Sequence, residues 1–371
     1  MSIEQRLTEL WYRPRRGPSL LEPLAWAYGA AVRARGGAYR RGWLPVRETV
    51  KPVVVVGNVT IGGTGKTPLV IWLAESLRER GLEAGIVTRG YGRRTRSRAP
   101  RIVRADTPWE EVGDEPLLVH RRTGCLTAVC ADRFAAAEQL VAEPIDLILS
   151  DDGLQHARLA RACEIAVIDG ARGLGNGRLL PAGPLREPAS RLNRVAAIVM
   201  NGSAEHPSLA HPSFAYPSLE QVALAAATPV RLPEGRAAPG APVLRMTLLA
   251  GHARRVDGTG TEQPLEAFRG GGVHAVAGIG HPERFFRELE GRGLEVSRHP
   301  FPDHHPFGAR DLAFDDGRSI LMTEKDAVRC AAIATPLMWY VPVSAHLDAV
   351  DAQVLLSEVC RRIDAFRPRT L

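Results

Sequence analysis

The sequence predicts an α/β fold with two doubly wound domains, each built on a parallel sheet covered by helices. Short runs of β-branched residues alternate with amphipathic helical patterns over residues 53–201, an alternation typical of such a sheet. Residues 203–241 are biased toward proline, alanine and serine, which predicts a linker. Strand and helix patterns resume over residues 273–322. The expected parts are a basic N-terminal segment (1–47), a first domain (48–202), the linker (203–241), a smaller domain (242–350) and a C-terminal helix (351–371).

The composition is that of a globular protein without a disulfide frame. The chain has 371 residues, of which 45% are hydrophobic and 24% charged, and this length accommodates two domains. The charges at Glu4, Arg6 and Glu9 precede any apolar run, so we expect no cleavable signal peptide. The five cysteines are scattered and odd in number, which argues against a zinc site and favours a reducing compartment: Cys125, Cys130, Cys163, Cys330 and Cys360.

The N-terminal segment carries most of the net positive charge. Residues 1–47 contain nine arginines and three glutamates, a net +6 out of the +7 of the whole chain. Within this segment, residues 20–32 form an apolar patch, and three tryptophans (Trp11, Trp26 and Trp43) lie in or near it. The patch is too short to span a bilayer, which needs about 20 apolar residues. It predicts either an amphipathic helix in a membrane interface or a helix docked on the first domain, and no known nucleic-acid-binding module is evident.

A glycine-rich loop follows the first predicted strand. The strand Val53–Val56 leads into residues 57–65, then into Lys66 and Thr67 and a helical pattern over residues 69–80. This order of strand, glycine loop, Lys-Thr and helix is typical of a phosphate-binding P-loop, and the alternative is a turn that binds nothing. Lys66 would reach the outer phosphates of ATP, and the Thr67 hydroxyl would ligate Mg²⁺. The expected ATP-binding residues are Thr60, which replaces the usual glycine, and Ile61, Gly62, Gly63, Thr64, Gly65, Lys66 and Thr67.

Two later strand ends in the first domain predict further parts of a site. The strand over residues 84–88 leads into the basic loop 89–94, and ligands bind at such strand ends in open α/β sheets, although a basic surface loop has the same composition. The strand over residues 145–150 ends in Asp151 and Asp152, the form of a Walker-B strand that holds Mg²⁺. Asp114 either caps the helix that follows it or faces the γ-phosphate.

The second domain contains one polar cluster of interest. A strand over residues 294–301 leads into Asp303-His304-His305, which favours a base or a hydrogen-bonding role over a metal site, with a solvated turn as the alternative. The glycine turn at residues 278–280 lacks the rest of a dinucleotide-binding fingerprint. The last helix, over residues 350–366, can pack on either domain.

Seven blocks of the chain together resemble the tetraacyldisaccharide 4'-kinase family, the kinases of the lipid A pathway. They occur in the order that the family has, and the loop with Thr60 in place of glycine is the family's own form. The blocks are residues 57–68, Arg89-Gly90-Tyr91-Gly92-Arg93, Gly113-Asp114-Glu115-Pro116, Asp151-Asp152-Gly153-Leu154-Gln155-His156, the loop from Pro181 to Pro188, Asp303-His304-His305 and Thr323-Glu324-Lys325-Asp326-Ala327.

The resemblance implies an activity, cofactors and a location. The expected reaction transfers the γ-phosphate of ATP to the 4'-hydroxyl of tetraacyldisaccharide 1-phosphate and forms lipid IVA in lipopolysaccharide biosynthesis. ATP and Mg²⁺ are the expected cofactors, and an acylated disaccharide lipid is the expected substrate, with no nucleic acid and no obligate protein partner. A substrate with four acyl chains stays in the bilayer, so the resemblance favours the membrane-interface interpretation of residues 20–32 and a peripheral protein on the cytoplasmic face of the inner membrane.

The resemblance also implies roles for individual residues. Asp114 is the expected base that takes the proton of the acceptor hydroxyl, assisted by His304 or His305, with the two domains closing over ATP. Thr67, Asp151 and Asp152 are the expected Mg²⁺ ligands. The expected substrate-binding residues, with the three arginines holding the lipid phosphate or transition-state charge, are Arg89, Tyr91, Arg93, Glu115, Gln155, His156 and Arg186.

Two other classes of function share the P-loop. A membrane-associated ATPase that acts as a conformational switch would hydrolyse ATP without a lipid acceptor. An ATPase that works on nucleic acid would hydrolyse faster with DNA or RNA. The kinase hypothesis instead predicts little hydrolysis until the glycolipid is present.

Overall fold

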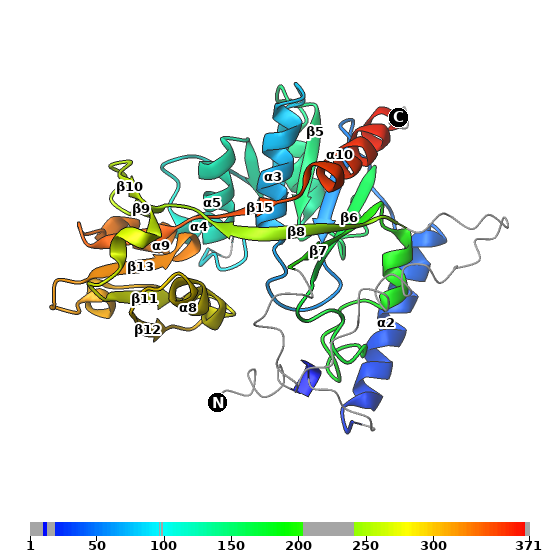
Figure 1. Ribbon diagram of the computed structural model, residues 1–371. Coiled ribbons are helices and arrows are strands. Elements are labelled where there is room, and N and C mark those ends of the chain that lie inside the picture. Colours follow the sequence, from blue (N-terminus) through cyan, green and yellow to red (C-terminus); the bar gives the residue numbers. More distant parts are fainter. Residues whose placement is uncertain (1–9, 13–18, 96, 98, 203–240, 368–371) are drawn as a thin grey trace. The chain divides into compact units, whose positions relative to one another are not determined.

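The computed structural model describes residues 10–12, 19–95, 97, 99–202 and 241–367, and the predicted linker lies almost entirely outside them. The chain forms two compact units that are each discontinuous in sequence. Unit 1 comprises residues 1–88, 132–248 and 345–371, and unit 2 comprises residues 89–131 and 249–344. Both are α/β, as the sequence predicts (Figure 1).

Unit 1 is built on parallel strands, of which β1, β2, β5 and β7 are buried along their whole length. The order is β8-β7-β6-β1-β5-β2, and each neighbouring pair is parallel. Strand β1 lies at the centre and pairs Val56 with Asp151 of β5, which brings the start of the glycine loop beside the predicted Walker-B acids. The strands are β1 (Val53–Gly57), β2 (Ala84–Thr88), β5 (Leu147–Asp151), β6 (Cys163–Asp169), β7 (Ala197–Asn201) and β8 (Val243–Ala250).

Three helices pack against this sheet. Helix α3 (Lys66–Arg78) follows the glycine loop and buries its apolar side chains against β1 and β5. Helix α6 (Arg133–Leu140) packs on β2 and β5. The C-terminal helix α10 (Ala349–Asp364) contacts α3 and β6 (Figure 1). The sequence did not decide which domain this last helix packs on, and the structure shows that it packs on unit 1.

Helix α2 (Glu22–Arg40) is longer than the apolar patch at residues 20–32 and has one docked face and one exposed face. On the docked face, Tyr28 Oη donates a hydrogen bond of 2.9 Å to the carbonyl of Arg186, and Glu22 pairs with Arg178 at 2.9 Å. Leu24 and Trp26 point away from the unit, with 59% and 68% of their surface exposed. Within the described residues, no helix is both long and apolar enough to cross a bilayer.

Unit 2 has its own sheet, in the order β10-β9-β14-β13-β11-β12. Strands β12, β11, β13 and β14 are parallel, and β9 and β10 are added antiparallel at one edge. One face of the sheet packs on a cluster that includes Phe286 and Leu289, and another cluster includes Phe307 and Met322. The strands are β9 (Ala253–Arg255), β10 (Glu262–Gln263), β11 (Val273–Ala277), β12 (Val296–Pro300), β13 (Ser319–Thr323) and β14 (Met338–Val341).

The helices of unit 2 come from both of its chain segments. Helix α8 (Pro282–Gly291) covers β11 and β12. Helix α9 (Glu324–Cys330) begins where β13 ends and packs against α5 (Asp114–Thr123). The first segment also contributes α4 (Trp109–Val112) and the antiparallel pair β3 (Arg101–Val103) and β4 (Thr127–Val129).

The division into units differs from the linear division expected from the sequence in two places. Residues 89–131, expected within the first domain, pack with unit 2, and most of β8, expected within the second domain, lies in unit 1. The reason is that strand and helix patterns report local structure, whereas the unit with which a segment packs depends on contacts between residues far apart in the sequence. The first segment therefore carries Asp114 into unit 2.

Candidate active site

The glycine loop of unit 1 has a backbone that only small residues allow. Gly65 precedes α3 with φ 94°, and a Cβ atom there would lie 2.7 Å from Asn201 Nδ2. Gly62 also has a positive φ, 109°. The N-terminus of α3 directly follows this loop, so its free N–H groups and the positive end of its dipole favour an anion there.

Three other segments of unit 1 hold the loop in shape. Asn201, at the end of β7, donates a hydrogen bond of 2.9 Å to the carbonyl of Thr64. Gln155 Nε2 donates one of 3.0 Å to the carbonyl of Asn58. The Ile61 N–H donates to the carbonyl of Pro184 at 2.9 Å, and Thr60 forms an antiparallel bridge with Leu185. Gln155, expected to bind substrate, thus has a contact that shapes the P-loop.

The two predicted Walker-B acids contact different partners. Asp151 is buried at the end of β5, and Thr67 Oγ1 donates a hydrogen bond of 3.3 Å to its Oδ2. Asp152 lies 3.6 Å from Lys66 Nζ and 3.2 Å from Arg186 Nη1. Burial by itself raises the pKa of Asp152, but Lys66 and Arg186 outweigh it and hold the pKa below its usual value. Asp152 therefore stays ionised near neutral pH.

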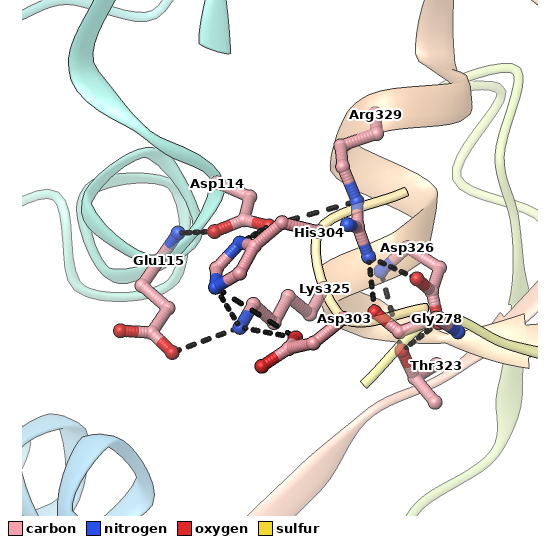
Figure 2. A network of polar contacts seen from close by, with 9 residues as sticks. All are labelled: Asp114, Glu115, Gly278, Asp303, His304, Thr323, Lys325, Asp326 and Arg329. Atoms are coloured by element: carbon pink, nitrogen blue, oxygen red, sulfur yellow. Dashed lines mark hydrogen bonds and ion pairs between the residues drawn. The ribbon is translucent and has the colours of Figure 1, made fainter. Parts of the chain in front are cut away.

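A buried carboxylate–histidine pair lies in unit 2 (Figure 2). Asp114, the first residue of α5, has 0% of its surface exposed, and His304 Nδ1 lies 2.9 Å from its Oδ2. Its Oδ1 accepts a hydrogen bond of 2.8 Å from the Glu115 N–H, so the carboxylate contacts the helix start as well as His304. Burial alone raises the pKa of Asp114, but the hydrogen bond with His304 and the charges of Lys325 and Arg329 lower it below its usual value.

The loop after β2 packs around the ring of His304. Tyr91 contacts the ring edge to face, with centroids 4.9 Å apart. At Gly92, a Cβ atom would lie 2.5 Å from His304 Nδ1. His304 itself has a positive φ of 58°, a conformation that costs energy in a residue other than glycine and is found at functional sites.

A lysine lies on the other side of the ring from Asp114. Lys325 Nζ is 3.4 Å from His304 Nε2, 3.0 Å from Glu115 and 3.5 Å from Asp303 (Figure 2). Burial lowers the pKa of Lys325, but Glu115, Asp114 and Asp303 raise it well above its usual value. Lys325 is therefore an ammonium ion at neutral pH.

Arg329, one turn further along α9, completes the network. It is buried, ion-pairs with Asp326, lies 3.5 Å from Asp114 and donates a hydrogen bond of 2.9 Å to the carbonyl of Gly278. Asp326 accepts hydrogen bonds from the Gly278 N–H at 3.1 Å and from Thr323 Oγ1 at 2.5 Å. These contacts fix the start of α9 to the loop after β11.

The other predicted residues have different contacts, each within its own unit. His305 Nε2 contacts Asp311 at 3.1 Å, and its ring packs on Phe301 and Phe307, so His304 is the histidine that meets Asp114. Arg89 is exposed and Arg93 half-buried in the loop that carries Tyr91. In unit 1, the carbonyl of His156 accepts a hydrogen bond from Arg161. In the described part of the chain, no group of three or more His, Cys, Asp or Glu side chains is arranged to hold a metal.

Reasoning from the sequence missed several residues that the structure places beside the glycine loop of unit 1 or beside the carboxylate–histidine pair of unit 2. Asn201 ends a predicted strand, and Lys325 and Arg329 follow another, so their position at strand ends was the available signal. Arg133 gave no such signal; it is buried and donates a hydrogen bond of 3.3 Å to the carbonyl of Asp151.

Comparison with known proteins gives one family. A model described as tetraacyldisaccharide-1-P 4'-kinase matches residues 18–361. The tetraacyldisaccharide 4'-kinase of Alkalilimnicola ehrlichii is 47% identical over 341 residues, which cover 92% of each chain. That of Pseudomonas putida is 44% identical over 347 residues, 93% of this chain and 94% of its own. The crystal structure of LpxK from Aquifex aeolicus, described as an "apo" form in complex with ATP, is similar with a TM-score of 0.72 and 26% identity over 92% of this chain and 98% of that one.

Proposed function

Because the chain belongs to the tetraacyldisaccharide 4'-kinase family, we propose that it transfers the γ-phosphate of ATP to the 4'-hydroxyl of tetraacyldisaccharide 1-phosphate and so forms lipid IVA. Membership makes the chain a lipid kinase, a phosphotransferase with an alcohol acceptor. The observation that carries the detailed proposal is the 2.9 Å contact between the buried carboxylate of Asp114 and His304. An alcohol acceptor must lose a proton, and this pair supplies a group that can take it.

In this proposal the glycine loop of unit 1 binds the phosphates of ATP. The Aquifex aeolicus relative is described in complex with ATP, and the loop here has the glycines, the helix start and the lysine that such a ligand needs. Lys66 contacts the outer phosphates. The backbone of residues 60–65, held by Asn201 and Gln155, surrounds the inner ones.

The residues beside the loop fit a magnesium ion. Thr67 and Asp151 place a hydroxyl and a carboxylate within 3.3 Å of each other, with Asp152 next in the chain, and Mg²⁺ prefers such oxygen ligands. We assign these three residues to Mg²⁺. When bound, the ion neutralises negative charge on the β- and γ-phosphates. Lys66 and Arg186, which both pair with Asp152, add positive charge at the same strand ends.

Asp114 is the base in this proposal, and His304 assists it. The lowered pKa of Asp114 keeps the carboxylate ionised, so it can accept the proton of the 4'-hydroxyl while the hydrogen bond from His304 stabilises and orients it. Tyr91, which packs on His304, lies in the same loop as Arg89 and Arg93. We assign this loop to the disaccharide and its phosphate, since arginines bind phosphate through paired N–H groups.

We further propose that α2 carries the protein on the membrane surface that holds its substrate. Its exposed side bears Leu24 and Trp26, and Trp43 beyond its end is 72% exposed. Arginines flank these residues, including Arg33, Arg35, Arg40 and Arg41. Apolar and aromatic side chains on one face with arginines around them suit an anionic lipid interface.

Transfer of labelled γ-phosphate from ATP to tetraacyldisaccharide 1-phosphate in detergent micelles with Mg²⁺ tests the proposal. We expect labelled lipid with the wild-type protein and none with Lys66→Ala. Asp114→Asn should bind ATP as the wild type does but lose transfer by about 10² to 10⁴-fold, the usual contribution of a general base. Labelled free phosphate without labelled lipid would contradict the kinase assignment, and unchanged turnover of Asp114→Asn would remove Asp114 from the mechanism.

A further inference from the structure

The motif Thr323-Glu324-Lys325-Asp326-Ala327 covers the end of β13 and the start of α9, and the function proposed above leaves its lysine without a role. The ammonium group of Lys325 lies within 3.5 Å of polar atoms of three residues from two separate segments of unit 2: Glu115 on α5, and Asp303 and His304 after β12. Only 17% of the lysine side chain is exposed. Holding so confined a cation among these groups costs side-chain entropy and desolvation, so its position calls for an explanation.

The hydrogen-bonding capacity of the groups decides where the proton of His304 lies. An ammonium ion has three N–H donors and no acceptor. His304 Nε2 faces the Lys325 ammonium at 3.4 Å and, beyond hydrogen-bond distance, Asp303 Oδ1 at 3.7 Å. It can therefore meet Lys325 favourably only through its lone pair, because a proton on Nε2 would point at a like charge. The ring proton then lies on Nδ1, which is 2.9 Å from Asp114 Oδ2. An ionised carboxylate accepts only, so His304 donates this proton to Asp114.

We propose that Lys325 is a positioning residue that holds His304 as the neutral tautomer with its proton on Nδ1 and so keeps Asp114 an ionised hydrogen-bond acceptor. Its part in the kinase reaction rests on the proposed function, whereas the tautomer is a property of unit 2 alone. Lys325 touches the ring edge that faces away from Asp114, so it acts through His304 and through its charge.

A purely structural role for Lys325 is the competing explanation, and the neighbouring residue provides its control. Glu324 also joins α9 to α5, because it pairs with Arg122 at 2.9 Å, and Arg122 also donates a hydrogen bond of 2.7 Å to Ser344. No contact of Glu324 with Asp114 or His304 is among those that the structure describes. Glu324→Gln therefore removes an interhelical ion pair without changing the groups around His304.

Nitrogen NMR of the full-length protein labelled with ¹⁵N-histidine tests the tautomer directly. His304 is assigned as the signal missing from His304→Gln. We expect neutral-pH shifts of an Nδ1–H tautomer in the wild type and in Glu324→Gln, and a mixture of both tautomers in Lys325→Met, which keeps the side-chain length but has no charge. A wild-type Nε2–H tautomer or imidazolium, or an unchanged tautomer in Lys325→Met, would overturn the proposal.

Kinetics test the consequence for the reaction. Since Lys325 is one of the charges that lower the pKa of Asp114, Lys325→Met should move the acid limb of the kcat profile to higher pH. It should also reduce kcat by about tenfold or more with little change in KM for ATP. Lys325→Arg, which keeps the charge, should restore part of kcat and part of the original pH profile. A reduced kcat with an unshifted acid limb would indicate a structural role. Failure of the wild type to phosphorylate lipid would reject the proposed function and leave the NMR result standing.

Discussion

The distance between the loop after β2 and His304 is set by a single glycine. Gly92 has φ 81°, and a Cβ atom there would lie 2.5 Å from His304 Nδ1, the nitrogen that meets Asp114. A contact shorter than 3 Å cannot be kept, so in Gly92→Ala either the loop or the imidazole must move. The side chain at this position is therefore coupled to the geometry of the carboxylate–histidine pair.

We expect Gly92→Ala to lose most of the transfer activity, because the alanine methyl group displaces the histidine ring from Asp114. Gly270→Ala is the matched control, since Gly270 has a similar φ of 78° and nothing within 4 Å of the added atom. Both variants should lose about 1 to 2 kcal/mol of unfolding free energy from the left-handed backbone, measured by urea titration. Equal activities of the two variants would show that the contact with His304 does not matter.

Residues whose role is set by local sequence could be predicted, and residues whose role depends on distant packing could not. The glycine loop, Lys66 and Thr67 are adjacent in the chain, so the order of strand, loop and helix indicated them. Asp114 and His304 are separated by 190 positions, and only the resemblance to a family connected them. Lys325 was part of a recognised motif, but its role depends on the ring nitrogen that it faces, which no sequence pattern records.

At the scale of single elements, the exposed side of α2 is the feature that the fold itself does not use. The sequence left open whether this helix docks on the protein or lies in a membrane interface. The structure shows that Glu22 and Tyr28 dock one face, while Leu24 and Trp26 stay exposed on the other. Because one face is docked and the other is exposed, the helix can pack on unit 1 and still present apolar side chains to a membrane interface.

We expect Leu24→Glu combined with Trp26→Glu to weaken binding to vesicles of anionic phospholipid, because the charges oppose both apolar insertion and the negative surface. Val350→Glu is the control: Val350 lies in the first turn of α10 in the same unit and is 72% exposed. Co-sedimentation with the vesicles measures the bound fraction, and circular dichroism checks that the helices remain. Equal losses in both variants would count against a specific role for α2.

Strands β11 and β12 carry a histidine pair that makes the stability of unit 2 depend on pH. His274 Nδ1 lies 2.9 Å from His299 Nε2, and His274 Nε2 lies 3.0 Å from Asp316. Burial and the neighbouring charges of His274 and Arg318 lower the pKa of His299 below its usual value. The pKa of Asp316 is lowered to about 2, so this carboxylate stays ionised throughout the range in which histidine titrates.

Stability should therefore decrease as the pH falls below about 6.5, the histidine value in an unfolded chain. There the unfolded chain binds a proton at His299 that the folded protein does not, and the state that binds more protons is favoured by acid. His299→Gln keeps a polar group at this position without titrating, and its unfolding free energy should fall less between pH 7.5 and pH 5.5. Parallel curves for the two proteins in urea titrations would show that His299 does not contribute.

At the scale of the whole molecule, one chain forms two separately packed units, each made of segments that are not contiguous in sequence. The sequence predicted two α/β domains, and the comparisons and the structure bear out the fold class. It did not reveal that residues 89–131 pack with unit 2 and that the chain rejoins unit 1 at α6, because the strand and helix patterns of this segment would suit either unit. Each unit has its own core, so cooperative unfolding of the whole chain is not required.

The cysteines allow this to be measured, because all five are free and they are divided between the units. Cys163 in unit 1 and Cys330 in unit 2 are buried, and burial raises the pKa of each thiol to about 12. Neither forms the reactive thiolate while its unit is folded, and only Cys360 is partly exposed.

Pulsed alkylation in rising urea, read by mass spectrometry, should therefore modify Cys360 first and then Cys163 and Cys330 at different midpoints. Addition of ATP with Mg²⁺ should raise the urea midpoint for Cys163, since the proposed nucleotide-binding residues lie in unit 1. At a ligand concentration 100 times the dissociation constant, the free energy of unfolding of this unit should rise by about 2.7 kcal/mol. A single midpoint for both thiols that shifts as one with ATP would show instead that the two units unfold together.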